Sequence, residues 1–190
     1  MSRNETVDDS SKRKDQSVKI ILTVLVIVLA NVMVSAQWQK GDEKVDDSSE
    51  RKSVDGFAGH LIIVEDPKAF IEEWTKPKTP TVKSISNVKR GKVIGAFVLF
   101  AGCKPDSAGV CNSVVDYVVV KPDGDVYAER KGEPLWNEQA PPPQNIQLSK
   151  AILGIRIAPK DPAGEYKVRA KVSDLNAGIT FELETKFRVK

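Results

Sequence analysis

The chain has 190 residues, with 29 basic and 26 acidic side chains and a formal net charge of +3 at pH 7. Such an even balance of charge argues against a dedicated nucleic-acid binder, because those proteins carry a strong basic excess. It also gives no sign of electrostatic steering toward acidic partners. A chain of this length is sufficient for one domain with a sizeable core, plus a terminal extension.

The N-terminal region combines a basic stretch, an apolar run and a short small-x-small segment after that run. Lys12-Arg13-Lys14 precede a mostly apolar run from Ile20 to Val34, and Val34-Ser35-Ala36 end it. This order is typical of a secretory signal peptide and predicts cleavage after Ala36. The alternative is an uncleaved inner-membrane anchor, although a spanning helix needs about 20 apolar residues and this run is shorter. We therefore expect a periplasmic or secreted protein, with residues 1–36 as its signal peptide.

Residues 37–56 are polar and charged, with few large apolar side chains. Such a segment cannot bury enough apolar surface to offset the entropy of ordering, so it is expected to be a disordered tether. Within it, Val45-Asp-Asp-Ser-Ser-Glu-Arg-Lys52 nearly repeats Val7-Asp-Asp-Ser-Ser-Lys-Arg-Lys14. The two copies flank the apolar run, and a duplication in the coding region is the simplest interpretation.

The folded part is expected to begin near Phe57, with a short strand and a short helix in residues 57–81. His60 to Val64 is apolar after its first residue, which is typical of a strand. Asp66-Pro67 then marks a helix start, because aspartate caps free amides and proline suits the first turn. The helix is expected to run from Lys68 to Trp74. Its three large apolar residues share one face: Phe70, Ile71 and Trp74.

Residues 82–190 are expected to form a succession of short strands joined by turns. Val93 to Ala101 is apolar throughout, which is typical of a strand buried on both faces. Asp123-Gly124 and Asn176-Ala-Gly178 are turn signals between pairs of strands. The other expected strands before the last hairpin are Ser113–Lys121, Val126–Arg130, Ile146–Leu148 and Ala151–Ala158.

The last hairpin has the clearest pattern. From Tyr166 to Val172 and from Phe181 to Val189, apolar residues alternate with polar or charged ones, as in strands with one buried face. Opposite charges on the outer faces are expected to help set the register. About seven short strands joined by turns predict a mostly β fold, an antiparallel two-sheet sandwich over residues 82–190 with one short helix before it.

The stretch Ile155-Arg-Ile-Ala-Pro-Lys-Asp-Pro-Ala-Gly-Glu-Tyr-Lys-Val-Arg-Ala170 resembles the end of many immunoglobulin-like or fibronectin-III-like modules of secreted bacterial proteins. In those modules an Asp/Pro/Gly corner precedes a tyrosine that starts the penultimate strand, and Tyr166 matches that tyrosine. The resemblance implies an immunoglobulin-like sandwich with a structural tyrosine corner, in which the hydroxyl bonds to nearby backbone. The whole chain is also similar to small secreted proteins of proteobacteria, a resemblance that implies no activity.

Two cysteines, Cys103 and Cys111, flank the turn-rich segment Lys-Pro-Asp-Ser-Ala-Gly-Val. In an oxidising compartment such a pair is expected to form a disulfide. A redox pair more often has Cys-x-x-Cys spacing, and no further cysteine or nearby histidine completes a metal site. We therefore expect a structural disulfide, and neither a metal nor a cofactor.

Enzyme signatures are mostly missing from the sequence. His60 is the only histidine, and no Gly-x-Ser-x-Gly motif accompanies it. Ser86-Asn-Val-Lys89 has the Ser-x-x-Lys spacing of some acyl-transfer enzymes but lacks their partner motifs. Asp123-Gly-Asp125 lacks the further ligands and closing glutamate of a calcium loop. We therefore expect a non-enzymatic protein with no catalytic residues.

The best candidate for a binding surface is the loop that contains Trp136, Pro141, Pro142 and Pro143. Three consecutive prolines favour a stiff polyproline II segment that loses little entropy on binding, and an exposed tryptophan nearby would anchor a partner. The structural alternative is that Trp136 closes one end of the sandwich while the prolines stiffen a crossover between sheets.

The expected function is an interaction module that binds an envelope protein or a cell-surface polymer through its loops or an open sheet edge. One alternative is a structural accessory subunit of an envelope assembly. The other is a small-molecule or carbohydrate binder that uses Trp74, Trp136 and the tyrosines as stacking platforms. No nucleic-acid partner is expected, and membrane contact is expected only if the signal segment is retained.

Overall fold

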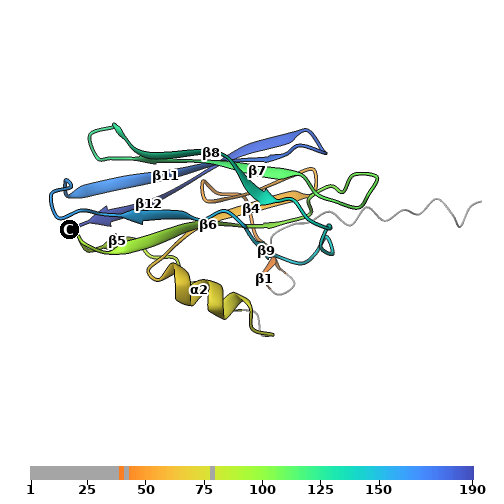
Figure 1. Ribbon diagram of the computed structural model, residues 1–190, viewed down its shortest axis with the longest axis horizontal. Coiled ribbons are helices and arrows are strands. Elements are labelled where there is room, and N and C mark those ends of the chain that lie inside the picture. Colours follow the sequence, from red (N-terminus) through yellow and green to blue (C-terminus); the bar gives the residue numbers. More distant parts are fainter. Residues whose placement is uncertain (1–38, 41–42, 78–79) are drawn as a thin grey trace, which may run out of the picture. The chain divides into compact units, whose positions relative to one another are not determined.

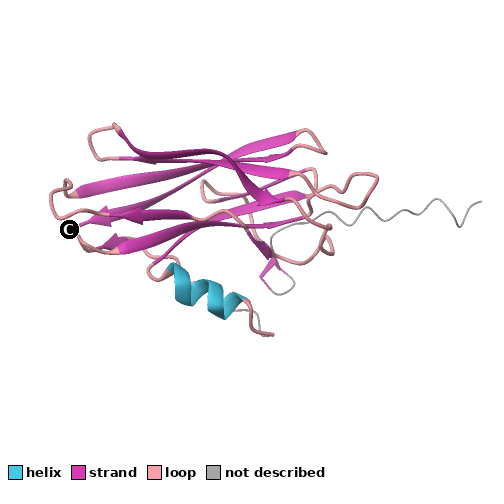
Figure 2. Cartoon of the chain, in the orientation of Figure 1, coloured by secondary structure: helices cyan, strands magenta, loops and turns pink. Residues whose placement is uncertain are grey.

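The computed structural model describes residues 39–40, 43–77 and 80–190, and its two five-stranded β-sheets pack face to face (Figure 1). Figure 2 shows the strands in two layers, with the one described helix on the outer side of one layer. The mostly β, two-sheet architecture predicted from the sequence is therefore confirmed. The apolar run, the cleavage site after Ala36 and the first copy of the near-repeat lie outside the described residues. Within the described ranges, no helix is both long enough and apolar enough to span a membrane.

The first sheet, which we call the helix-side sheet, has the strand order β10-β6-β4-β3, and its neighbouring strands are antiparallel. Its strands are β3 (Arg51–Val54), β4 (Phe57–Val64), β6 (Val93–Ala101) and β10 (Leu153–Arg156). The short strand β9 (Gln147–Leu148) pairs with the end of β6.

The second sheet has the order β5-β12-β11-β7-β8. Its strands are β5 (Asn87–Val88), β7 (Ser113–Val120), β8 (Val126–Trp136), β11 (Gly164–Asp174) and β12 (Ile179–Val189). The β5 strand runs parallel to β12, and the other neighbours are antiparallel. Two further short strands, β1 (Gln39–Lys40) and β2 (Glu43–Lys44), form a separate antiparallel pair.

The last hairpin buries the face that its alternation predicts. In β11 and β12, the buried side chains include Tyr166, Val168, Ala170 and Val172 on one strand, and Leu183 and Phe187 on the other. The outer face pairs Arg169 with Glu184, whose Nε and Oε2 atoms are 2.8 Å apart. Burial on one face and a charged pair on the other both favour this register, because a one-residue slip would reverse the two faces.

The helix-side sheet is apolar on both faces. In β6, Ala96, Val98 and Phe100 belong to the core between the sheets, whereas Phe97, Leu99 and Ala101 belong to a second cluster on the outer face. Helix α2 (Pro67–Trp74) covers this outer cluster with Phe70, Ile71 and Trp74, and Val45, Val82 and Leu148 add to the cover. The uniformly apolar sequence of β6 follows from this burial on both sides.

Helix α2 begins where its sequence predicts. The side chain of Asp66 accepts a hydrogen bond from the Ala69 backbone N–H at 3.0 Å, and Pro67 occupies the first turn. A Cβ atom on Gly95 would lie only 2.7 Å from Cγ of Pro67. The glycine therefore allows the start of α2 to approach β6 closely.

Two of the expected domain boundaries need correction. Strand β4 lies between β3 and β6 in the helix-side sheet, so the residues of β4 belong to the sandwich and do not precede it. The expected tether is also wrong at its C-terminal end, because Arg51–Val54 form strand β3. An edge strand is held mainly by backbone bonds and needs few apolar side chains. Just before β3, the carbonyls of Ser49 and Glu50 accept bonds from Glu184 and Leu61 backbone N–H groups, at 2.6 and 2.8 Å.

Tyr166 lies near the start of β11 with its ring fully buried. Its hydroxyl donates a hydrogen bond to the Pro162 carbonyl at 3.0 Å, four residues upstream. Its ring stacks on Phe187, with centroids 5.2 Å apart, and meets the ring of Tyr127 edge-on. Burial, and secondarily the charge of Asp161, raise the pKa of the Tyr166 hydroxyl. These contacts join the corner before β11 to the core.

His60 predicts a pH dependence of stability. Burial of this half-buried β4 side chain, and secondarily the charge of Arg51 opposite it on β3, hold the pKa of His60 below its usual 6.5. The unfolded chain therefore binds a proton more readily, and the free energy of unfolding falls as the pH drops below about 6.5 toward the folded-state pKa. Urea unfolding at about pH 7.5 and 5.5 should show a smaller decline in His60→Gln than in the native protein. An equal decline in both proteins would contradict this role.

Candidate functional site

Several connections gather at one end of the sandwich, which we call the loop end. They are the turn after β3, the loop between β6 and β7 that carries both cysteines, the segment after Trp136, and the turn between β11 and β12. In Figure 1 these connections are on the right. The isolated pairing of Val110 with Gln139 connects the loop between β6 and β7 to the segment after Trp136.

Cys103 and Cys111 form the predicted disulfide, with Cα atoms 6.0 Å apart. The enclosed loop is ordered by its own side chains, because Asp106 Oδ1 accepts hydrogen bonds from the backbone of Ala108 at 2.8 Å and Val110 at 2.9 Å. Gly109 has a φ of +82°, a left-handed conformation that favours glycine. The disulfide loop is therefore a rigid part of the loop end.

A buried aspartate joins the disulfide loop to the last hairpin. Asp174 is 1% exposed, and its Oδ2 accepts a hydrogen bond from the Lys104 backbone N–H at 2.7 Å. Its Oδ1 accepts from the backbone of Asn176 and Ala177, at 3.1 and 3.2 Å. The Asn176 amide donates in turn to the carbonyls of Lys104 and Val110. The sequence predicts only the turn here, although Asp and Asn are the residues that bond to turn backbones.

Trp136 ends β8 and is half-buried at the loop end. Its ring packs on Phe100, with centroids 5.7 Å apart, and its Nε1 donates a hydrogen bond to the Gln139 carbonyl at 3.0 Å. The ammonium group of Lys150 lies 5.9 Å from the ring centroid. These contacts are the ones expected of a side chain that closes the end of the sandwich.

The three prolines after Trp136 lead directly into a turn. Pro142 and Pro143 are exposed, Pro141 is half-buried, and the Pro142 carbonyl accepts a hydrogen bond from the Asn145 backbone at 2.9 Å. The preceding residues are tied to the disulfide loop, since Cys111 N–H donates to the Glu138 carbonyl and Ala140 N–H to the Gly109 carbonyl. The prolines therefore end a fixed segment and begin the stretch that passes helix α2.

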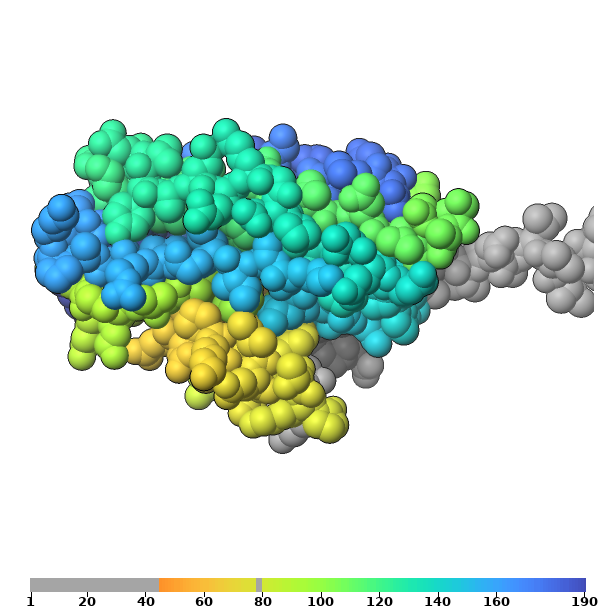
Figure 3. Space-filling view, in the orientation of Figure 1, coloured from red at the N-terminus to blue at the C-terminus, as the bar shows by residue number. Residues whose placement is uncertain are grey.

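A groove of about 610 Å³ lies where this stretch passes the end of α2. Figure 3 shows α2 (gold) as a ridge that stands out from the sandwich. We call the hollow the α2 groove. Its lining residues are Trp74, Lys76, Pro77, Pro80, Val82, Leu99, Gln144, Asn145, Ile146 and Gln147. The lining thus combines Trp74 and two prolines at the end of α2, the buried Leu99 and half-buried Val82 of the outer cluster, and three side-chain amides from the stretch before and in β9.

Four uncharged polar side chains of the described lining have no side-chain hydrogen bond within the described part of the chain. Neither the Trp74 indole N–H nor any of the three amides, Gln144, Asn145 and Gln147, forms a side-chain hydrogen bond with another described residue. The indole of Trp136, by contrast, is already bonded. Lys76 is the charged residue of the described lining, and it pairs with Glu73. An aromatic face beside unpaired amides, without uncompensated charge, suits a neutral polar ligand.

The remaining sequence candidates lie apart from the groove. His60 lies in β4, and Ser86 and Lys89 flank β5 at the other end of the sandwich. Asp123 and Asp125 both bond to the ammonium group of Lys121 in the turn between β7 and β8. Among the described residues, no group of three or more His, Cys, Asp and Glu side chains is arranged to hold a metal ion.

No family model and no curated protein matches this chain. Among solved structures, a Niemann-Pick type C2 protein from Japanese carpenter ant is 14% identical, with a TM-score of 0.37 over 68% of this chain and 89% of that one. The CARDB domain of a Pyrococcus furiosus protein is 12% identical, with a TM-score of 0.35 over 77% and 100%. A family 123 glycoside hydrolase from Clostridium perfringens is 12% identical, with a TM-score of 0.37 over 69% and 27%. Similarity this weak assigns no family.

Proposed function

We propose that this protein is a non-catalytic binding module that holds a segment of a neutral saccharide polymer of the cell envelope in the α2 groove. The observation that carries the proposal is that one groove is lined by Trp74 and by three amides that make no side-chain hydrogen bond to other described residues. The compartment is extracytoplasmic in this proposal, and the Cys103–Cys111 disulfide supports an oxidising environment. An immunoglobulin-like sandwich is part of the same proposal, supported by the Tyr166–Pro162 bond and the antiparallel sheets.

The chemistry of the groove favours a saccharide over other neutral ligands. A tryptophan ring offers a flat apolar face and one N–H donor, which matches a sugar ring with an apolar C–H face and polar edges. A side-chain amide offers two donors and an acceptor, so Gln144, Asn145 and Gln147 can each bond to a pair of neighbouring hydroxyl groups. The volume of about 610 Å³ lies within the usual range of ligand pockets, and the open form of the groove suits part of a longer chain.

Calorimetric titration with the tetramers of N-acetylglucosamine and of glucose tests this proposal. We expect Trp74→Ala to weaken binding of the preferred tetramer at least tenfold, about 1.4 kcal/mol, because the stacking surface is lost. Trp74→Phe keeps an aromatic cover on the outer cluster and should have an intermediate affinity. Gln147→Ala should weaken binding as well.

Gln139→Ala is the matched control for that titration. It removes an amide from the same loop, but this amide lies outside the groove and bonds to the Ala108 carbonyl at 3.3 Å. The affinity of Gln139→Ala for the preferred tetramer should equal that of the native protein. Native protein that binds neither tetramer, or an equal loss in Gln139→Ala, would contradict saccharide binding in the α2 groove. Thermal unfolding of each variant confirms that the sandwich is folded.

Docking of an envelope protein on the loop end is a second candidate function. Leu175 is 54% exposed at the tip of a turn that Asp174 and Asn176 hold rigid. A pre-ordered apolar contact loses little entropy on binding. Crosslinking in the native host should then capture one dominant partner, and Leu175→Asp should abolish that capture while saccharide affinity is unchanged. Capture that persists in Leu175→Asp would exclude this turn as the contact.

A further inference from the structure

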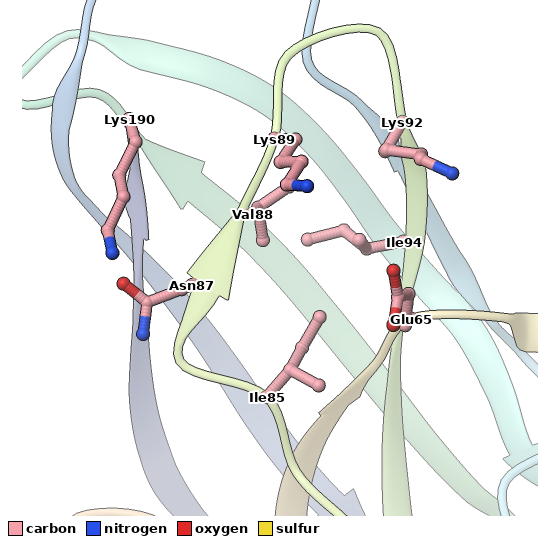
Figure 4. Close-up of a pocket in the computed structure, with 8 residues that line it drawn as sticks. All are labelled: Glu65, Ile85, Asn87, Val88, Lys89, Lys92, Ile94 and Lys190. Carbon is pink, nitrogen blue, oxygen red and sulfur yellow. The ribbon is translucent and has the colours of Figure 1, made fainter.

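A second pocket lies at the end of the sandwich opposite the loop end, between β5 and the start of β6 (Figure 4). Its volume is about 260 Å³. The apolar part of its lining consists of Ile85, Val88 and Ile94, of which Val88 and Ile94 are buried. The polar part consists of Glu65, Asn87, Lys89, Lys92 and Lys190. We call it the lysine pocket.

Backbone hydrogen bonds fix the walls of the lysine pocket. The turn that carries Lys89 and Lys92 is anchored to the segment after β10, because Gly91 N–H donates to the Ile157 carbonyl at 2.7 Å. Arg90 lies in the same turn, and its guanidinium donates to the carbonyls of Asp161 at 2.9 Å and Lys190 at 3.2 Å. The pocket is therefore formed before any ligand binds, which lowers the entropic cost of binding.

The charges around the lysine pocket are unbalanced. Three lysines and one glutamate line it, and in the described structure none of these four side chains belongs to a salt bridge. Six other described lysines, among them Lys121 and Lys150, are paired with acidic side chains. In Figure 4, Lys89 and Lys92 lie on one side of the apolar floor and Glu65 lies near Ile94 on the other. Three ammonium groups and one carboxylate give the described lining a net positive charge, which favours an anion over a cation.

We infer that the lysine pocket binds a small organic anion of the monocarboxylate class, with a short apolar body. The carboxylate lies between Lys89 and Lys92, and the carbon chain lies over Val88 and Ile94. The buried apolar floor disfavours a fully hydrated inorganic ion, and the lysines disfavour a cation. The volume is below the roughly 300–1,000 Å³ of pockets for drug-sized ligands, which restricts the ligand to a few carbon atoms. This site is separate from the α2 groove and does not depend on the function proposed there.

Methyl NMR of the protein, titrated with hexanoate, 1-hexanol and hexyl phosphate, tests the inference. We expect hexanoate to shift the methyl signals of Val88 and Ile94, and 1-hexanol to bind at least tenfold more weakly. The double variant Lys89→Gln/Lys92→Gln should lose at least tenfold in hexanoate affinity. The control Lys171→Gln removes an exposed lysine from the outer face of β11 and should leave the affinity unchanged. Raising the salt from about 20 to about 500 mM should weaken hexanoate binding.

Several outcomes would overturn the inference. They are no methyl shifts with hexanoate, 1-hexanol binding as tightly as hexanoate, or equal losses in Lys171→Gln and the double variant. Hexyl phosphate that binds more tightly than hexanoate would overturn the assignment to a carboxylate. Because Lys89 and Lys92 are exposed, the double variant should keep the native thermal unfolding temperature, so a loss of affinity reports on the pocket itself.

Discussion

Replacing Asp174 by alanine is expected to lower the free energy of unfolding by about 3 kcal/mol, because three backbone N–H groups lose their acceptor in a buried site. Those groups belong to Lys104, Asn176 and Ala177, and the side chain that they surround is 1% exposed. The loss affects two connections at once, since the first N–H lies in the disulfide loop and the others lie in the last hairpin turn.

Urea denaturation of Asp174→Ala and of a matched control measures this effect. Asp116 is the control, because its half-buried carboxylate accepts one backbone bond, from Gly132 at 2.7 Å, and that bond is exposed to solvent. Asp116→Ala should cost less than about 1 kcal/mol, since water can reach the Gly132 N–H and replace the lost acceptor. Equal costs for the two variants would show that burial of the Asp174 network contributes nothing. Asp174→Asn keeps one acceptor oxygen and should lie between the native protein and Asp174→Ala.

Loss of the Cys103–Cys111 bond is expected to lower the free energy of unfolding by about 2.5 kcal/mol. The two cysteines are eight positions apart, and closing a loop of that length removes about this much chain entropy from the unfolded state. The native loop should keep its conformation, because Asp106, Asp174 and Asn176 bond to its backbone independently of the sulfurs.

The disulfide effect is measured by urea unfolding of the Cys103→Ala/Cys111→Ala variant beside the native protein with and without reductant. Reduced native protein and the variant should unfold at similar urea concentrations, and reductant should not change the variant. A triple variant that also carries Asp174→Ala tests coupling, because both features order the same loop. Native protein whose unfolding is insensitive to reductant would contradict the expected contribution.

The strands that the sequence predicts well are those whose burial shows in the residue pattern. Val93–Ala101 matches β6 at both ends, and the period-two alternation locates β11 and β12. Strand β3 was missed because its residues are polar and its backbone bonds depend on β4, which no local pattern shows. Strand β8 continues six residues beyond the predicted end at Arg130, since irregular pairing with β7 and exposed charged residues hide its pattern.

The candidate site was less accessible to sequence analysis than the fold. The disulfide follows from the number of cysteines and their spacing alone. The α2 groove, however, joins Trp74 to Gln144–Gln147, and these residues meet only because β9 pairs with the end of β6. Burial of Asp174 likewise depends on the distant disulfide loop. Trp136 was recognised as important, but its role depends on Phe100 beneath it and Gln139 beside it.

Helix α2 both covers an apolar sheet face and lines the α2 groove. None of its eight residues is fully buried, yet Phe70, Ile71 and Trp74 cover the apolar outer face of the helix-side sheet. Local opening of so lightly anchored a segment requires less free energy than global unfolding, and it would uncover a surface prone to self-association. A saccharide bound to both Trp74 and the three amides of the groove would hold α2 against the sheet. Occupancy of the groove would then protect the protein against aggregation and proteolysis.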